Sequence, residues 1–223
     1  MGSDPMRVIH LIGGGDTGGA KTHVLNLLKE LNQYIDAQLF CFRKGDFSED
    51  AAKMGIPIEV IESGNPVVGL RELKRRLAGQ KVDIIHCHGA RGNLMGNLIK
   101  KHLGAPVVTT VHSDYRLDYL GRPVARLSYG TTNMVALRRV NFYIGVSDPM
   151  TDILFERDFP ADRIYTIYNG IDFKTPIQTV PKEEFLKSVG MEWEPEDVIA
   201  GIAVRLSPVK DVPTLLRAMK IAC

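Results

Sequence analysis

Short runs of β-branched and aliphatic residues alternate along the chain with stretches that have helical spacing. The apolar runs lie at residues 7–12, 36–42, 56–62, 82–88, 106–112, 142–147 and 163–170. Their length and composition are typical of strands. Because they are nearly continuous in Val and Ile rather than alternating, we expect a parallel sheet that is covered on both faces.

Helices are predicted between these strands. The clearest follows the first strand, where Val24, Leu27, Leu28 and Leu31 recur at positions i, i+3, i+4 and i+7. Similar patterns occur in "LRELKRRLAG", in "GNLMGNLIKKHLG" and over about residues 123–139. Strands that alternate with helices predict a doubly wound α/β domain of the Rossmann-like kind, which we place at residues 6–172.

The pattern changes after "YNGID". Residues 173–197 combine prolines with many charges and predict a linker that holds a short helix. Residues 198–206 ("VIAGIAVRL") predict a strand, and "DVPTLLRAMKIAC" predicts a helix. One strand and one helix cannot close a core of their own. We therefore expect residues 198–223 to open an incomplete second Rossmann-like domain, with the chain as the front part of a two-domain protein.

Composition excludes some functions. A net charge of +2 in 223 residues gives no case for nucleic acid as a partner. The basic clusters at residues 74–76 and 138–139 fall in amphipathic stretches and are interpreted as solvated helix faces, with peripheral membrane contact as the lesser alternative. Cys41 and Cys87 lie in strand-like runs and are expected to be buried thiols of a cytoplasmic protein. No apolar run reaches the ~18 residues that a membrane span needs.

A glycine-rich loop, "LIGGGDTGGAKTH", follows the first predicted strand. Backbone N–H groups of such a loop can approach an anion closely, above all at the start of a helix. The triphosphate-binding P-loop requires a glycine directly before its lysine. Here Ala20 separates Gly19 from Lys21, so the register of that motif is broken.

The dinucleotide fingerprint G-x-G-x-x-G is a second interpretation of this loop. Gly13, Gly15 and Gly18 match it between a strand and a helix, which is the right context. The acidic residue that would hold the ribose is replaced by Arg43 and Lys44 after the second strand. An NADP-dependent oxidoreductase therefore stays open as an alternative.

The whole chain supports a third interpretation. The motifs "GGAKTHVLNLL", "DIIHCHG", "VVTTVHSDY", "YNGID" and "GIAVRLSPVKDVPTLLRAM" occur in this order over residues 6–222. Together they resemble the family 4 glycosyltransferases, which are retaining enzymes of the GT-B fold. The resemblance implies two Rossmann-like domains facing a cleft, a UDP- or GDP-linked sugar as donor substrate, and neither a metal nor a cofactor.

The resemblance also implies roles for particular residues. Gly18 and Gly19 match paired glycines whose amides approach the donor diphosphate. His112 ends the fifth strand, where open α/β sheets bind ligands, and it matches a histidine that contacts the donor sugar. We assign it to positioning and electrostatics, because in retaining transfer the leaving phosphate accepts the acceptor's proton. Arg205 and Lys210 match two cations that neutralise the departing diphosphate.

Acceptor binding is expected at Lys21 and Ser113. Lys21 departs from the family pattern, which often has an acidic or amide residue there. A cation in this loop points to an anionic acceptor, such as a phosphorylated or carboxylated one. Ser113 begins the polar stretch "SDYRLDYLGRP", which is expected to shape acceptor selection.

The pair His86 and His88 raises the question of a metal. Residues two apart on a strand share a face, so the two imidazoles can converge. A metal site needs third and fourth ligands, and the sequence identifies none. We therefore predict no metal and interpret the pair as a cleft wall. His10 and His102 are interpreted as structural.

These features predict a hexosyltransferase that uses a nucleotide-diphosphate sugar with retention of configuration. The resemblance implies that the paired glutamates that hold the donor in this family, E-x7-E, belong to the remainder of the second domain, so we expect these residues alone to be inactive. Three alternatives stay open. They are a sugar-nucleotide 2-epimerase of the same fold, the NADP-binding oxidoreductase, and a non-catalytic binding module.

Overall fold

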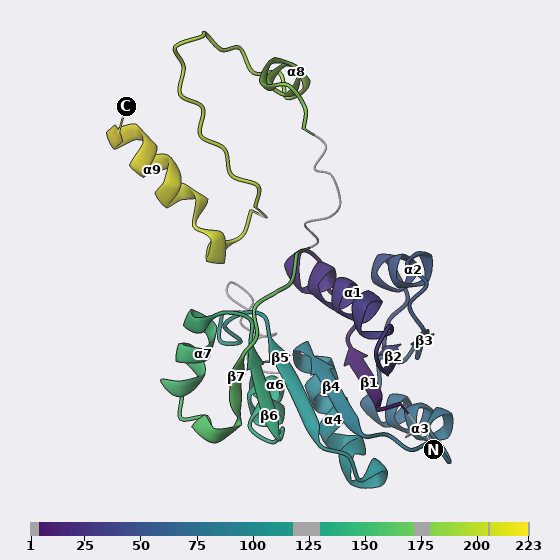
Figure 1. The fold of residues 1–223 in the computed structure, drawn as a ribbon. Helices are drawn as coiled ribbons and strands as arrows, with labels where there is room; N and C mark the ends of the chain where they lie inside the picture. Colours follow the sequence, from purple (N-terminus) through teal and green to yellow (C-terminus); the bar gives the residue numbers. More distant parts are fainter. Residues whose placement is uncertain (1–4, 118–129, 172–178, 205, 223) are drawn as a thin grey trace. The chain divides into compact units, whose positions relative to one another are not determined.

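The computed structural model describes residues 5–117, 130–171, 179–204 and 206–222, and the chain divides into two compact units, Met1–Gly170 and Ile171–Cys223. The first unit is built on a seven-stranded sheet in the order β3-β2-β1-β4-β5-β6-β7 (Figure 1). Every strand pairing is parallel. The strands are β1 Arg7–Ile12, β2 Asp36–Cys41, β3 Ile58–Val60, β4 Ile84–His88, β5 Val107–Val111, β6 Phe142–Gly145 and β7 Ile164–Thr166. The predicted doubly wound α/β fold is confirmed.

Helices follow the strands as the spacing predicts. The first unit contains α1 Gly19–Leu31, α2 Asp46–Lys53, α3 Pro66–Arg76, α4 Gly89–Leu103, α6 Thr131–Leu137 and α7 Asp148–Phe155. A short 3-10 turn, Ala161–Arg163, precedes β7. The apolar spacing along the sequence does not predict α2 or α7. Of the helix expected over residues 123–139, residues 123–129 lie outside the described part. No helix of the described residues is both long enough and apolar enough to cross a membrane.

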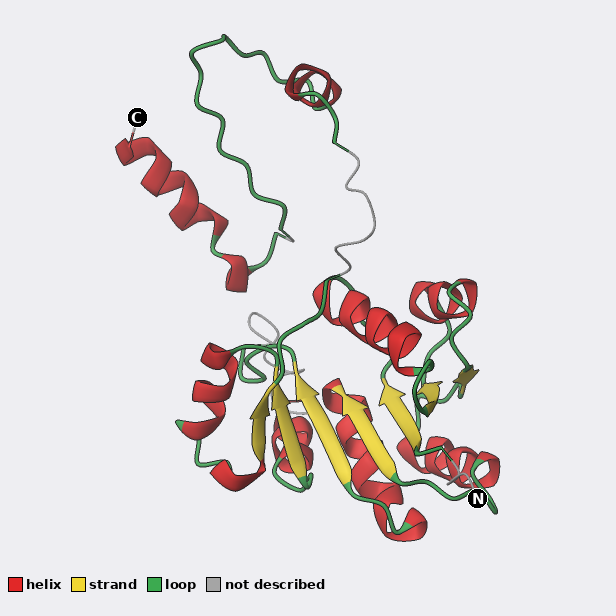
Figure 2. Cartoon of the chain, in the orientation of Figure 1, coloured by secondary structure: helices red, strands yellow, loops and turns green. Residues whose placement is uncertain are grey.

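Both faces of the sheet are covered, as Figure 2 shows. Successive side chains of β1 point to opposite faces of the sheet, so this strand contributes to a hydrophobic cluster on each face. Ile9 and Leu11 point to one face and pack in a cluster with Met95 of α4. Ile12 points to the other face and packs in a second cluster with Val24 of α1. All five side chains are fully buried, which accounts for the apolar run in the sequence.

Two of the glycines of helix α4, Gly92 and Gly96, lie against the sheet with no room for a side chain. A Cβ at Gly92 would stand 2.3 Å from the carbonyl oxygen of Leu11, and one at Gly96 would stand 2.4 Å from Cys87 Sγ. Such distances are far inside van der Waals contact, so only glycine fits at either position. Because α4 begins at the residue that follows β4, this packing restrains the start of the helix at the carboxyl end of that strand.

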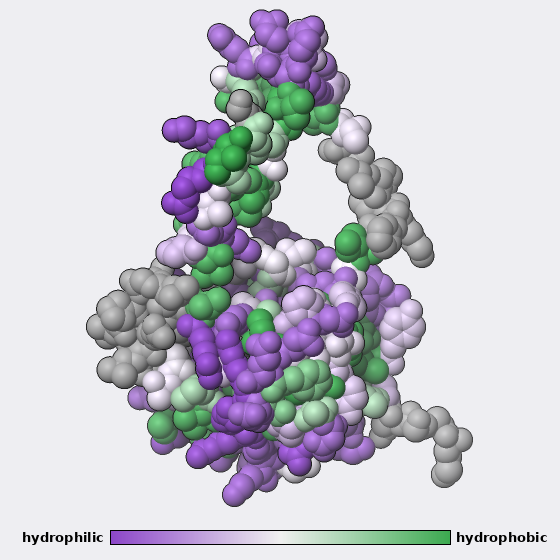
Figure 3. Space-filling model, turned by 90° about the vertical axis from the view of Figure 1, so that its left-hand side faces the viewer, coloured by the Kyte–Doolittle hydropathy of each residue, from purple (hydrophilic) through white to green (hydrophobic). Residues whose placement is uncertain are grey.

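The second unit contains α8 Lys182–Ser188, the 3-10 turn Pro208–Lys210 and α9 Val212–Ala222. The expected short helix and the last helix are therefore present. The strand expected over residues 198–206 is a wrong prediction, because residues 198–204 and 206 have no regular structure. A strand needs a neighbour to pair its backbone groups, and the described part of this unit offers none. Hydrophobic side chains along the unit remain exposed, among them Val198 at 93% and Leu206 at 85% (Figure 3).

The only tryptophan of the chain, Trp193, belongs to this second unit. The ammonium group of Lys182 lies 4.0 Å from the centre of its indole ring. This is a cation–π contact between the first residue of α8 and the segment that follows the helix. The contact joins two parts of the unit that are eleven residues apart in the sequence.

The strand order places a topological switch point between β1 and β4. The chain leaves β1 toward β2 on one side, and it leaves β4 toward β5 on the other. Loops that leave neighbouring strands in opposite directions separate there, and open α/β sheets bind ligands at such a point. In Figure 1 this edge is where the arrowheads of β1, β4 and β5 lie. The glycine loop, His88 and His112 all stand at this edge.

Candidate active site

The glycine loop turns sharply at its second glycine. Gly14 has φ +86°, and a Cβ there would lie 2.6 Å from the carbonyl oxygen of Arg43. Both conditions exclude other residues. The N–H of Gly14 donates to Asp16 Oδ2 at 3.2 Å, which holds the carboxylate inside the loop. Burial raises the pKa of Asp16, and the hydrogen bond from Gly14 opposes that rise.

Helix α1 presents an open N-terminus to this edge. Gly18, with φ 63° and ψ −141°, precedes the first helical residue, and no side chain caps the helix. The first turn contains no acidic residue. No described atom lies within 4 Å of the Cβ position at Gly18 or at Gly19. The first N–H groups of the helix therefore have no side-chain partner among the described residues, as an anion-binding helix start would require. The role of Gly18 and Gly19 toward a diphosphate stays a prediction.

His112 follows β5 directly and ends a row of three imidazoles. Nδ1 of His10, in β1, lies 3.2 Å from Nε2 of His88, the last residue of β4. Nδ1 of His88 lies in turn 3.4 Å from Nε2 of His112. The parallel register sets His10 beside His86 and Ile12 beside His88, so His10, His86 and His88 share one face of the sheet.

The rings of this row meet end to end. The ring centres of His10 and His88 are 5.5 Å apart, with planes inclined by 10°. Those of His88 and His112 are 5.7 Å apart, inclined by 30°. Since the centres are much farther apart than the facing nitrogens, the nitrogens lie nearly on the line that joins the centres. Both contacts therefore have the linear geometry of hydrogen bonds.

A metal site must be considered again here, because His10 brings a third imidazole next to those of His86 and His88. Nitrogen atoms of His10, His86 and His88 lie within 4.8 Å of one another. A tetrahedral ion needs nitrogens that converge on a common point. Those of His10 and His88 face each other instead, and Nε2 of His86 is engaged with Thr110 Oγ1 at 2.8 Å. We interpret the cluster as hydrogen-bonded, and the absence of a metal stays a prediction.

The imidazoles at this edge are neutral at pH 7. Burial lowers the pKa of His10 to about 3 and that of His112 to about 4, and the charge of His23 contributes in both cases. Burial and the neighbouring histidines hold the pKa values of His86 and His88 well below the usual range. A neutral imidazole has one donor and one acceptor nitrogen, so each ring can pass a hydrogen bond along the row.

His23 closes the site from α1. Its ring centre lies 5.0 Å from that of His112, with the planes inclined by 65°. Burial lowers the pKa of His23, and a hydrogen bond with Asn169, just after β7, opposes that shift. Nε2 of His23 is buried and has no hydrogen-bond partner among the described residues. His23 therefore connects the helix of the glycine loop with the loops that follow β5 and β7.

An ion pair fixes the loop that carries His112 and Ser113. The guanidinium of Arg157 donates two hydrogen bonds of 2.5 Å to the carboxylate of Asp114 and lies 4.8 Å from the ring centre of Tyr115. Arg157 holds the pKa of Asp114 below its usual range. A bidentate pair of this kind restricts both side chains and so restrains the loop at Asp114, two residues after His112.

The structure unites some of the predicted site residues and not others. Gly18, Gly19, His112 and Ser113 stand at the same edge of the first unit. Lys21 is also at the start of α1, but its ammonium group lies 2.6 Å from Asp50 Oδ2 and donates to the carbonyl oxygen of Asp46. Its charge is thus balanced by α2, and its role toward an acceptor stays a prediction.

The two predicted diphosphate cations belong to the second unit. Lys210 ends the 3-10 turn Pro208–Lys210 and is exposed. Arg205 lies outside the described residues. Their roles toward a diphosphate stay predictions.

Four residues of this edge had no predicted role at the site: His10, which was interpreted as structural, Asp16, His23 and Asn169. Asp16 lies inside the quoted glycine loop, so its position was a signal. His23 lies one helical turn after Gly19, which places it over the start of the helix. The part played by His10 depends on the register of β1 against β4, which no local pattern contains.

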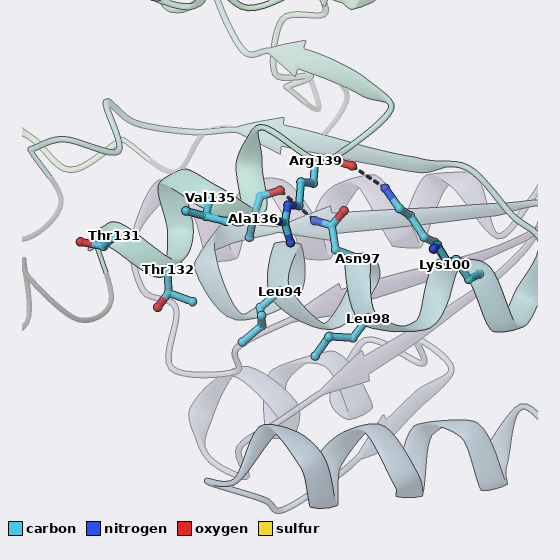
Figure 4. A pocket seen from close by; sticks show the side chains of 10 residues that line it. Leu94, Asn97, Leu98, Lys100, Thr131, Thr132, Val135, Ala136 and Arg139 are labelled. Atoms are coloured by element: carbon cyan, nitrogen blue, oxygen red, sulfur yellow. Dashed lines mark hydrogen bonds between the residues drawn. The ribbon is translucent and has the colours of Figure 1, made fainter.

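A groove of about 600 Å³ lies elsewhere, between α4 and α6 (Figure 4). Asn97 bridges the two helices by donating to the carbonyl oxygen of Ala136 at 2.8 Å, and Lys100 donates to that of Arg139. Both helices pack on the face of the sheet that carries Ile9 and Leu11. The groove is therefore separated by the sheet from His10, which shares the opposite face with Ile12.

Known proteins identify the family to which this arrangement belongs. Alpha-maltose-1-phosphate synthase of Mycolicibacterium smegmatis is 25% identical over 213 residues, which cover 90% of this chain and 53% of that protein. The structure of HepE of Anabaena in complex with UDP-glucose has a TM-score of 0.73 at 19% identity, over 96% of this chain and 57% of that one. UDP-N-acetylglucosamine 2-epimerase of Rickettsia bellii has a TM-score of 0.54 at 13% identity, over 73% and 44%.

The chain thus spans about half the length of the relatives that it matches. The structural likenesses show the fold, which is that of GT-B glycosyltransferases. The sequence model of Glycosyltransferase Family 4 matches residues 17–175, from the glycine loop through β7. The chain belongs to Glycosyltransferase Family 4.

Proposed function

We propose that the chain forms the acceptor-side part of a glycosyltransferase that moves a hexosyl group from a UDP- or GDP-linked sugar to an acceptor with retention of configuration. The observation that carries the proposal is the open N-terminus of α1 at the same edge as neutral His112. Membership of the family supports it. So does HepE, a neighbour in fold whose structure contains UDP-glucose.

In the proposed reaction the bond between the anomeric carbon and the diphosphate oxygen breaks. A bond to the acceptor oxygen forms on the same face, and the acceptor's proton passes to the departing phosphate. No protein base is then required. The N–H groups that follow Gly18 stabilise the charge that develops on the diphosphate. His112 holds a hydroxyl of the sugar, while Arg205 and Lys210 neutralise the leaving group. The chemistry uses no metal and no cofactor.

Binding of the donor can be tested on the 223-residue chain by calorimetric titration with UDP-glucose and GDP-mannose. We expect one of them to bind weakly, because the glycine loop and His112 are present but the donor-holding glutamates of the family are expected in the remainder of the second domain. Gly19→Ala should weaken that binding further, because the new methyl group occupies the open space at the helix start. Gly64→Ala is the matched control, since its Cβ position is also free of contacts within 4 Å. If neither nucleotide sugar binds, the proposal fails.

Turnover is a separate question. Because the chain spans only about half the length of its relatives, we propose that the chain alone has no transferase activity. Robust release of UDP or GDP in the presence of acceptors would overturn this. A 2-epimerase is the second candidate, supported by the structural likeness to the Rickettsia enzyme. Conversion of UDP-N-acetylglucosamine to its 2-epimer, read by proton NMR, would favour that candidate.

A further inference from the structure

The row His10–His88–His112 has an end inside the protein and an end at the site. His10 is fully buried, and His88 is 1% exposed. His112 is only partly buried. A neutral imidazole carries one N–H, so two linear hydrogen bonds between three rings leave two arrangements of the protons. The two arrangements differ in whether the nitrogen at each end of the row carries a proton or a lone pair.

In the first arrangement, Nδ1–H of His10 donates to Nε2 of His88, and Nδ1–H of His88 donates to Nε2 of His112. The proton of His112 must then be on Nδ1, at the partly buried end of the row. In the second arrangement every donor is reversed. Nε2–H of His112 donates to His88, Nε2–H of His88 donates to His10, and the proton of His10 is on Nε2.

The buried end decides between them. Nε2 of His10 is buried and has no hydrogen-bond partner among the described residues. In the second arrangement this atom carries a buried N–H with nothing to accept it. Orphaned buried donors are rarer in proteins than unsatisfied acceptors, because the desolvation of a donor is not recovered. The first arrangement leaves only a lone pair there, so it is the favoured one.

We propose that His10 and His88 are positioning residues that fix the tautomer of His112, so that its imidazole presents Nδ1–H to the site. This rests on the proposed function only in naming the ligand: the N–H is then a donor to a hydroxyl or phosphate oxygen of the nucleotide sugar. His112 thereby acts as a hydrogen-bond donor at that nitrogen and not as a base. In water a neutral histidine favours Nε2–H, so the Nδ1–H form is a diagnostic state.

Long-range ¹H–¹⁵N correlation spectra of the full 223-residue chain, labelled at histidine and recorded at pH 7, test this directly. His112 is assigned by the signals that disappear in His112→Gln. We expect a protonated Nδ1 and an unprotonated Nε2 at His112, with the same pattern at His88 and His10. A protonated Nε2 at His112 in the unsubstituted chain would overturn the proposal, with no variant needed.

Two variants separate this role from a merely structural one. His88→Phe removes both hydrogen bonds, so we expect His112 to return to the Nε2–H form. His88→Asn keeps an amide donor close to the position of Nδ1, so we expect Nδ1–H at His112 to persist. His102→Gln, at an exposed position of α4, is the control and leaves His112 unchanged. An unchanged tautomer in folded His88→Phe would contradict the proposal.

The spectra do not depend on any sugar nucleotide, so the two proposals can fail separately. If the Nδ1–H form is found but no nucleotide sugar binds, the proton arrangement stands and the proposed function fails. Titration with Zn²⁺ addresses the remaining alternative. Stoichiometric binding that shifts the signals of His10, His86 and His88 together would replace the hydrogen-bonded row by a metal site and overturn the inference.

Discussion

At the scale of single residues, burial determines what His112 can do. A histidine in water is partly protonated near pH 6.5, whereas burial and the charge of His23 lower the pKa of His112 to about 4. The imidazole is therefore neutral over the range in which most enzymes work. A group in this state is suited to orienting a ligand by one hydrogen bond.

The lowered pKa predicts a loss of stability in mild acid. Between pH 6.5 and 4 the unfolded chain binds a proton at this histidine that the folded chain does not, so stability falls as the pH falls. For His112 alone the loss between pH 7 and 5 is about 2 kcal/mol. Urea unfolding at both pH values measures it. His112→Asn should lose about 2 kcal/mol less than the unsubstituted chain, and equal losses would contradict the prediction.

The ion pair between Asp114 and Arg157 predicts a second effect at this scale. Asp114→Asn removes the negative charge from a pair whose side chains are 15% and 13% exposed. The variant should unfold about 1–3 kcal/mol more easily, since hydrogen bonds to charged groups at partly buried sites have this value. Asp162→Asn is the control, because its carboxylate is 79% exposed and 3.8 Å from Arg163. That change should stay within about 0.5 kcal/mol.

At the scale of the elements, the contact between Gly92 of α4 and Leu11 of β1 determines how closely the helix packs on the sheet. Replacing glycine by alanine inside a helix usually stabilises a protein by about 0.5–1 kcal/mol. For Gly92→Ala the sign should reverse, because the new methyl group meets the carbonyl oxygen of Leu11. We expect a loss of about 1–3 kcal/mol or more.

Gly69→Ala in α3 provides the matched comparison for this prediction. Its Cβ position has ordinary contacts of 3.5 Å and longer, with Arg91 Nη2 nearest. The change should therefore be neutral or stabilising by up to about 1 kcal/mol. Thermal and urea unfolding of the two variants, followed by circular dichroism, give the two values. A Gly92→Ala variant as stable as Gly69→Ala would show that α4 can move away from the sheet.

The elements also show how far sequence alone could go. Continuous Val and Ile runs located every strand of the first unit, because a strand buried on both faces leaves a strong pattern. Several strands were predicted too long, most clearly β7, which comprises only Ile164–Thr166 of the predicted 163–170. Placing His112 at a strand end was sufficient to place it at the site. Its contact with His88 and that of His88 with His10 required the register between strands, which depends on tertiary packing.

At the scale of the whole molecule, the chain consists of two compact units of unequal kind. Apart from Leu186, the buried hydrophobic residues in the described part of the chain all lie before residue 165. We therefore expect residues 6–170 alone to keep the stability of the first unit to within about 1 kcal/mol, as independent domains do. Urea unfolding of the shortened and the full chain, followed at the far-ultraviolet signal, measures this. A loss of several kcal/mol in the shortened chain would contradict it.

The location of Trp193 has a practical consequence for every such measurement. Tyrosines and phenylalanines populate the sheet, but the single indole belongs to the second unit, beneath Lys182. Its fluorescence therefore reports unfolding of the second unit rather than unfolding of the sheet. Melting curves from tryptophan emission and from circular dichroism will then follow different events. A difference between the two melting temperatures would then follow from the position of the single tryptophan in the second unit. It would not indicate a folding intermediate in the sheet.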